Sequence, residues 1–423
     1  DKSSMDYIFD RNGESLARWQ ITAPDTKRSL YPQGPYIAHI LGWSFPADDK
    51  LQRGKRGLEG AYQEGFPGNK VHLTLDTRIE RMLSKAMGHY VGAAVALDPK
   101  TGEILGMVSQ PTYNPSKVAD REEYRKYKSN AFTPLLDRAL EKAYDCGSIS
   151  KIVTSAAALD KNMDLKNIFP VICRRYYSVG GTPIHDWKTH RTVRDVADAF
   201  SKSCNVAFAR LGEALGPGGL VDMFNAFGFN RAMALVPGNL SPAPAVSVSA
   251  TASLGDLARA AAGLGELNRL TPLHAALIGA TVANEGLMPS PRLVLQIKNI
   301  RGGTILQVAP AEPARVMKPA TAQALKEMML EAIETGTGHR AKVPGLQIAG
   351  KTATAGQRDE FFGKFDGWFV AFAPVSQPQI VVAIFLEHGG TGEDAAAPVA
   401  GAFFKQWMEI PKTSRQPRAN SRQ

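Results

Sequence analysis

The stretch CGSISKIVTSAAAL, residues 146–159, decides how this chain is interpreted, because a serine follows a glycine and opens a helical pattern. Ser148 and Lys151 are three residues apart and therefore share one face of the predicted helix. A serine hydroxyl becomes a nucleophile when a base removes its proton, and a lysine in a dry pocket can be that base. The helix N-terminus adds partial positive charge where an oxyanion would form. Taken alone, the pair is more typical of a capping serine beside a solvated lysine.

A second polar group follows the helical pattern of residues 193–200. Ser203 offers a hydroxyl that could relay a proton, and Asn205 offers an amide that could orient a peptide substrate. Taken alone, this segment is more typical of a polar loop between helices.

A third group, GKTAT at residues 350–354, lies on a predicted strand. Because side chains alternate along a strand, Thr352 and Thr354 face the same side. Lys351 and the two hydroxyls could hold a carboxylate, and a backbone N–H could complete an oxyanion hole. The three groups occur in the order Ser-x-x-Lys, Ser-x-Asn and Lys-Thr-x, which is typical of penicillin-binding proteins and serine β-lactamases.

The segments around these groups predict an α+β fold. Helical patterns dominate residues 146–286, and another helix is expected at residues 395–408. A further helix, capped by Asp76 or Thr77, would bury Ile79, Leu83 and Met87. Strand patterns occur at residues 71–75, 92–97, 103–109, 346–355, 367–373 and 380–387. Strands on both sides of a helical middle indicate one sheet assembled from distant segments, with helices on its faces.

Three parts of the chain are predicted from its composition. Residues 1–70 are broken by Gly, Pro and charge clusters, and form a small irregular leading module. Residues 71–410 form the main domain. Residues 411–423 carry basic side chains among Ser, Pro, Asn and Gln without an apolar period, and are expected to be a disordered tail.

Composition also limits the function. The 423 residues, 44% of them apolar, can bury a large core. The formal charge is +10, but basic and acidic residues are interleaved, so no nucleic-acid partner is expected. The sequence contains no apolar run of about 18 residues, so no membrane span is predicted within it.

Metal and cofactor sites are not expected either. Cys146, Cys173 and Cys204 are too few and too irregularly spaced for a zinc cage or a disulfide framework. His185 and His190 are five residues apart, a poor helical spacing for two ligands, and Gly180, Gly181 and Pro183 predict a loop there.

Over nearly its whole length the chain resembles the ectodomain of a class B penicillin-binding protein, without the membrane anchor. The stretches that carry the resemblance are DRNGESLA (10–17), RGLEG (56–60), LDPKTGEIL (97–105), LTPL (270–273), ANEG (283–286), WFVAFAP (368–374) and AP (397–398). The resemblance implies the penicillin-binding/serine β-lactamase-like fold: an antiparallel sheet with helices on both faces and a helical subdomain.

The resemblance also implies a role for each polar residue of the three groups. Ser148 would be the nucleophile and Lys151 its base. Ser203 would relay a proton towards the leaving amine, and Asn205 would orient the substrate. Lys351 would tune the site electrostatically.

The substrate would then be held mainly by the third group. Thr352 and Thr354 would bind the terminal carboxylate of the donor peptide. The backbone N–H groups of Ser148 and Thr354 would form the oxyanion hole.

The implied activity is peptidoglycan D,D-transpeptidation. Stem peptides would be cross-linked through a Ser148 acyl-enzyme with release of D-alanine, and penicillin and other β-lactams would acylate the same serine. The implied location is the extracytoplasmic face of the bacterial cytoplasmic membrane, and the implied partner is a SEDS-type glycosyltransferase.

Two positions depart from the family pattern. Ala353 stands where the family usually has glycine, and strand alternation aims its Cβ away from Thr352 and Thr354. We expect an active but slowed enzyme. Cys146 stands where proline is common, and it could be a free thiol, a disulfide partner of Cys204 or, with poorer geometry than the serine, a nucleophile.

Three alternatives use the same residues. A D,D-carboxypeptidase differs only in using water as acceptor. A class A β-lactamase needs a catalytic glutamate, and alignment on Leu267-Asn268 places Leu264 there instead. A β-lactam sensor or catalytically lapsed scaffold finds its only support in Ala353.

Overall fold

A computed structural model describes residues 4–23, 26–43, 57–58, 69–118, 120–233, 235, 245–356 and 365–411. At its centre is a five-stranded antiparallel sheet with the order β17-β18-β19-β5-β6. Its strands are β5 (Gly92–Leu97), β6 (Ile104–Gln110), β17 (Ala349–Ala355), β18 (Asp366–Ala373) and β19 (Ile380–Leu386). The sheet therefore combines strands from both sides of the helical middle, as predicted, and β17 forms one edge.

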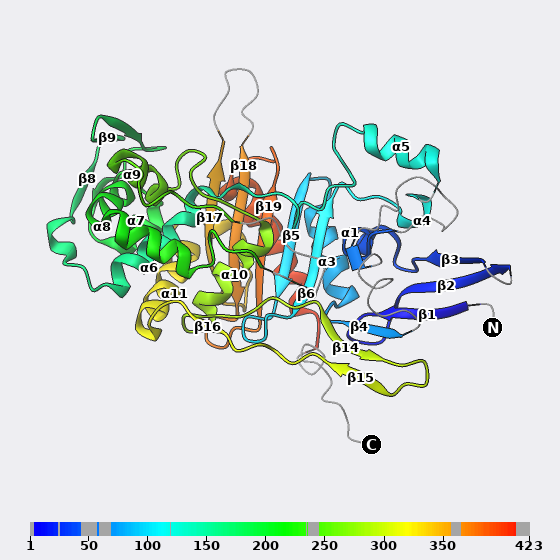
Figure 1. Cartoon of the computed structure of the whole chain (residues 1–423). Helices are drawn as coiled ribbons and strands as arrows, with labels where there is room; N and C mark the ends of the chain where they lie inside the picture. The colour runs from blue at the N-terminus through cyan, green and yellow to red at the C-terminus, as the bar shows by residue number, and fades with distance from the viewer. Residues whose placement is uncertain are drawn as a thin grey trace.

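Helices cover both faces of this sheet (Figure 1). α10 (Pro272–Ala283) is apolar around its circumference and fully buried against one face, which is the pattern of a core helix. α3 (Thr77–Met87) and α12 (Ala397–Met408) pack against the other face. The N-terminus of α3 is capped by the Asp76 carboxylate, as predicted, and its buried apolar residues are those the sequence predicts. The α+β prediction is confirmed.

A helical subdomain lies beside β17 (Figure 1). Its helices are α6 (Ser150–Asp160), α7 (Val196–Lys202), α8 (Asn205–Ala226), α9 (Leu254–Ala262) and α11 (Pro319–Glu334). The same region contains two antiparallel strand pairs: β8 (Val171–Cys173) with β11 (Arg191–Val193), and β9 (Tyr176–Val179) with β10 (Thr182–His185). The predicted loop is therefore confined to Gly180 and Gly181, which form the turn between β9 and β10, whereas Pro183 lies within β10. These strands have three or four residues each, too few for a period-two pattern to stand out.

A second sheet has the order β15-β14-β4-β1-β2-β3 and lies on the far side of β6 in Figure 1. Its strands are β1 (Ser4–Phe9), β2 (Ser15–Ala23), β3 (Thr26–Leu30), β4 (Lys70–Leu73), β14 (Val294–Lys298) and β15 (Thr304–Gln307). The leading strands thus share a sheet with two strands from the middle of the chain. The boundary at residue 70 stays a prediction, and it took no account of β14 and β15.

The described chain also contains shorter helices and strands. They are α1 (Ala38–Leu41), α4 (Pro115–Val118), α5 (Arg121–Ser129), β7 (Tyr144–Asp145), β12 (Arg269–Leu270), β13 (Leu287–Met288) and β16 (Ala314–Arg315). Among the described residues no helix is long and apolar enough to cross a membrane. The predicted basic tail lies outside the described residues from residue 412 onward.

Candidate active site

Ser148 lies on a single 3₁₀ turn, Gly147–Ile149, which leads directly into α6. Gly147 has φ +50°, and a Cβ there would lie only 2.8 Å from Thr354 O, so the tight approach of this turn to β17 requires glycine. Gly263 makes a second close approach, because a Cβ on it would lie 1.9 Å from Gly147 O. The turn is therefore clamped between β17 and the end of α9, with the Ser148 side chain facing a cleft.

Lys151 lies beneath Ser148 and is completely buried. Its Nζ donates to Ser148 Oγ at 2.9 Å, to Asn205 Oδ1 at 2.6 Å, and to the carbonyl and hydroxyl oxygens of Ser203 at 3.0 and 3.2 Å. Burial lowers the pKa of Lys151 to about 8, although the charges of Asp186 and Cys204 oppose the shift. At pH 7 about a tenth of such a lysine is neutral and able to accept the serine proton.

Ser203 and Asn205 complete a hydrogen-bonded network around this amine. Ser203 ends α7 in the left-handed region, with φ +55°, and its hydroxyl donates to Ser148 Oγ at 3.1 Å. Asn205 begins α8, and its Nδ2 donates to His185 O at 3.0 Å. Both side chains of the second predicted group therefore converge on the first, although more than 50 residues separate them.

The third predicted group lies across the cleft on β17. Thr352 Oγ1 is 2.5 Å from Thr337 Oγ1, and Thr354 Oγ1 accepts from Gly392 N at 3.0 Å. Lys351 is fully buried, and its Nζ has no hydrogen-bond partner within the described part of the chain. Burial, together with the charge of Lys151, holds the pKa of Lys351 well below its ordinary value. The amine lies 5.3 Å from the centre of the Phe200 ring, and its N–H groups have no acceptor in the described part of the chain, so they can donate to a substrate that reaches them.

The cleft has a volume of about 400 Å³. Five predicted side chains line it: Ser148, Ser203, Asn205, Thr352 and Thr354. Sequence reasoning missed Trp187, Gly263, Thr337 and Glu393, which also line the cleft. None of these four stands in a motif with a chemical signature, so no local signal could have identified them.

Ala353 packs behind the nucleophile. Its side chain is 2% exposed and belongs to an apolar cluster that includes Trp368 on the neighbouring strand. A Cβ placed on Gly147 would lie 3.4 Å from the Ala353 methyl group. The added methyl therefore lies against the turn that carries Ser148.

The three cysteines are free and buried. Burial raises the pKa of Cys146 to about 12, and its Sγ lies 2.9 Å from Ser150 Oγ, so this thiol is a poor candidate nucleophile. Burial also raises the pKa of Cys204, whose Sγ accepts from Ala207 N at 3.4 Å.

Among the residues that the structure describes, one group of side chains could hold a metal ion. Cys173, Asp186 and Cys204 place their ligand atoms within 4.8 Å of one another, and His190 Nε2 lies 3.3 Å from Asp186 Oδ1. Burial alone would raise the pKa of Asp186, but hydrogen bonds from His190 and Cys204 and the charge of Lys151 lower it to about 2. The histidine pair considered from the sequence is not brought together, because His185 is exposed with its ring against Tyr176.

Comparison with known proteins gives a consistent result. Residues 92–409 match the family model described as the penicillin binding protein transpeptidase domain. The peptidoglycan D,D-transpeptidase PbpA of Mycolicibacterium smegmatis is 32% identical over 366 residues, covering 79% of this chain and 72% of that protein. The peptidoglycan D,D-transpeptidase MrdA of Acinetobacter baumannii is 26% identical, covering 89% of this chain and 66% of that protein.

Solved structures are similar over nearly the whole chain. The D,D-transpeptidase domain of a peptidoglycan glycosyltransferase from Eggerthella lenta has a TM-score of 0.86 at 29% identity, covering 97% of this chain and 99% of that one. The penicillin G acyl-enzyme complex of penicillin-binding protein A from Mycobacterium tuberculosis has a TM-score of 0.85 at 27% identity, covering 96% and 99%.

Proposed function

Because the chain belongs to the penicillin-binding protein transpeptidase family, we propose that it is a peptidoglycan D,D-transpeptidase whose acylated nucleophile is Ser148. One observation carries the assignment of the nucleophile. Ser148 Oγ accepts a hydrogen bond from Lys151 Nζ at 2.9 Å, and burial lowers the pKa of that amine to about 8. A nucleophile and its base are thus within proton-transfer distance.

Acylation would begin when neutral Lys151 takes the Ser148 proton and Oγ attacks the carbonyl carbon of the penultimate D-alanine. The oxyanion would be held by the backbone N–H groups of Ser148 and Thr354. Ser203, bonded to both Ser148 and Lys151, would pass a proton to the leaving amine, and D-alanine would depart. Attack of Ser148 Oγ on the β-lactam carbonyl carbon of penicillin would follow the same path. The lactam C–N bond would break, its nitrogen would take the proton and stay attached to the adduct, and a stable acyl-enzyme would remain.

The opposite wall would position the donor peptide. β17 is the edge strand of the described sheet, so its outer backbone groups would pair with an extended peptide. Thr352 and Thr354 would bind the terminal carboxylate, with the unpaired Lys351 amine below them. Asn205 would contact the donor amide from the helical side.

The residues of the cleft favour a cell-wall transpeptidase over a class A β-lactamase. Glu266 lies at the surface, where it pairs with Arg269 at 2.7 Å. Leu264, the residue that aligns with the catalytic glutamate, lines the cleft and has no proton to exchange.

We further infer that the chain acts at the extracytoplasmic face of the membrane beside a SEDS-type glycosyltransferase. The support is the family membership alone. Co-purification with such a polymerase from a bacterial membrane would test it, and its absence under conditions that retain other partners would count against it.

The first experiment is labelling with a fluorescent penicillin, followed by gel and intact mass. We expect one covalent adduct on the unaltered protein and none on Ser148→Ala, because removing a nucleophile costs many orders of magnitude in rate. Rapid loss of penicillin without an adduct would indicate a β-lactamase. Neither adduct nor turnover in folded protein would support the scaffold alternative.

A further inference from the structure

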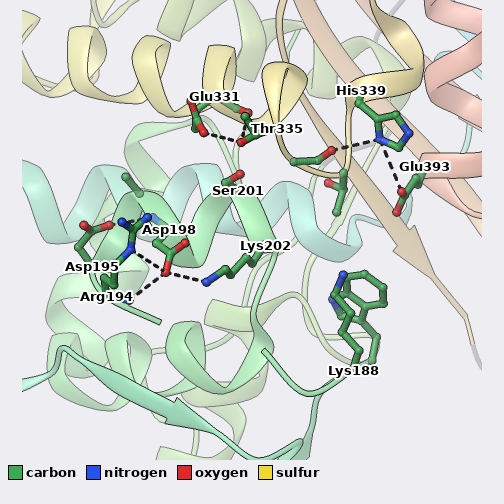
Figure 2. Close-up of a pocket in the computed structure, with 14 residues that line it drawn as sticks. Lys188, Arg194, Asp195, Asp198, Ser201, Lys202, Glu331, Thr335, His339 and Glu393 are labelled. Carbon is green, nitrogen blue, oxygen red and sulfur yellow. Dashed lines mark hydrogen bonds and ion pairs between the residues drawn. The ribbon is translucent and has the colours of Figure 1, made fainter. Parts of the chain in front are cut away.

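A second cavity of about 470 Å³, shown in Figure 2, shares lining residues with the catalytic cleft. It lies between α7, the C-terminal end of α11 and the segment of Trp187 and Lys188. Trp187, Thr337 and Glu393 line both cavities. The two cavities are therefore neighbours that share part of their lining.

Most charges of this cavity are already paired. Asp198 forms ion pairs with Lys202 at 2.9 Å and with Arg194 at 3.6 Å, as Figure 2 shows. His339 lies 3.8 Å from Glu393. Lys188 has no carboxylate partner among the residues that the structure describes, and its Nζ lies 4.1 Å from the centre of the Trp187 ring. Asp195 and Glu331 also have no cationic partner in the described chain, and they accept hydrogen bonds from Asp198 N and Thr335 Oγ1 instead. The Lys188 ammonium group, which lines the second cavity beside Trp187, is thus available for an external anion.

The cavity lies at the end of the cleft from which the acceptor must approach. The acceptor amine must take the position that the leaving D-alanine nitrogen vacates, so the acceptor approaches from the leaving-group end. Under the proposed function that end is marked by Thr352, which would bind the D-alanine carboxylate. Thr352 contacts Thr337, and Thr337 lines the second cavity. The cavity therefore begins where the leaving group departs.

We propose that this cavity is the binding site of the acceptor stem peptide, and that Lys188 selects an acceptor carrying a carboxylate beside its attacking amine. The inference rests on the proposed function and extends it from the donor to the acceptor. An acceptor of the diaminopimelate class has such a carboxylate, whereas an acceptor of the lysine class lacks it. Lys188 would pair with the carboxylate while its stem packs on Trp187, which is 47% exposed.

The transfer step balances without a further reactant. The neutral acceptor nitrogen attacks the acyl carbon, a C–N bond forms, and the bond from that carbon to Ser148 Oγ breaks. One proton leaves the nitrogen and returns to Oγ through Ser203 and Lys151. Lys188 touches neither bond, so it is a specificity-determining residue rather than a catalytic one.

The test compares two acceptors that differ by one carboxylate. A donor peptide ending in D-Ala-D-Ala is incubated with a stem tripeptide ending in diaminopimelate or with the same tripeptide ending in lysine, and mass spectrometry gives the ratio of cross-linked to hydrolysed donor. We expect Lys188→Met to lower the ratio about fivefold with the diaminopimelate acceptor and less than twofold with the lysine acceptor. Lys166→Met, an exposed lysine outside both cavities, is the matched control and should change neither ratio.

Labelling with fluorescent penicillin, which needs no acceptor, is measured on every variant. Absence of labelling on the unaltered protein would mean that the proposed function fails. Normal labelling of Lys188→Met with equal losses for both acceptors, or with no loss for either, would overturn the acceptor site alone. Loss of labelling in Lys188→Met would also overturn it, because Lys188 would then act on the donor step.

Discussion

The two walls of the catalytic cleft differ in how far their polar groups are satisfied. On the helical wall the Lys151 amine has four oxygens of Ser148, Ser203 and Asn205 within hydrogen-bond distance, enough for all its N–H donors. On the strand wall Lys351, buried just as deeply, makes no hydrogen bond with the described residues. The two walls therefore have different roles. The helical wall is preorganised for proton transfer, and the strand wall provides an amine that can donate to the substrate.

The largest effect is expected when the Lys351 amine, which distinguishes the strand wall from the helical wall, is removed. Lys351→Met should lower the rate of acylation by penicillin about 100-fold, the usual cost of losing one preorganised electrostatic group. The same change should raise the free energy of unfolding by about 1 kcal/mol, because an unpaired buried amine is replaced by an apolar side chain. Stopped-flow labelling and thermal unfolding measure the two effects.

The control for this variant is Lys405→Met on the exposed side of α12, which should change neither quantity. If Lys351→Met were destabilising, the amine would have a partner in the free protein, and the contrast between the walls would fail.

The pH dependence of acylation sharpens the assignment of the helical wall. Burial lowers the pKa of Lys151 from its ordinary value to about 8, and only the neutral amine can accept the Ser148 proton. The second-order rate constant for acylation should therefore rise about tenfold per pH unit below about 8 and level off above it. A profile that is flat from pH 6 to 9, in protein whose circular dichroism spectrum is unchanged, would exclude Lys151 as the base.

The smallest effect is expected from a change at Ala353, which packs against the turn that carries Ser148. Ala353→Gly removes the methyl group that packs against the Ser148 turn, and we expect acylation to become faster, by at most about tenfold. Glycine inside a strand should cost about 0.5–1 kcal/mol of stability. Acylation no faster than in the unaltered protein would show that the turn already accommodates the methyl.

Much of the site could be predicted because each motif is a local pattern. Ser148 and Lys151 share a face through helical spacing alone, and Thr352 and Thr354 share a side through strand alternation. Their order along the chain carried the resemblance. The core strands were also predicted, because four to eight apolar residues with flanking turns form a recognisable pattern.

What the sequence alone supplied, then, was the set of candidate catalytic residues and the α+β class. Tertiary structure alone decided that the Lys151 amine has hydrogen-bond acceptors whereas the Lys351 amine has none among the described residues. It also decided that Thr337 and Glu393 border the cleft. Finally, it decided that β14 and β15 join the leading strands. The physical reason is range. Helical and strand periodicity act between neighbours, whereas burial, pairing and cavity shape depend on contacts between residues often more than 50 positions apart.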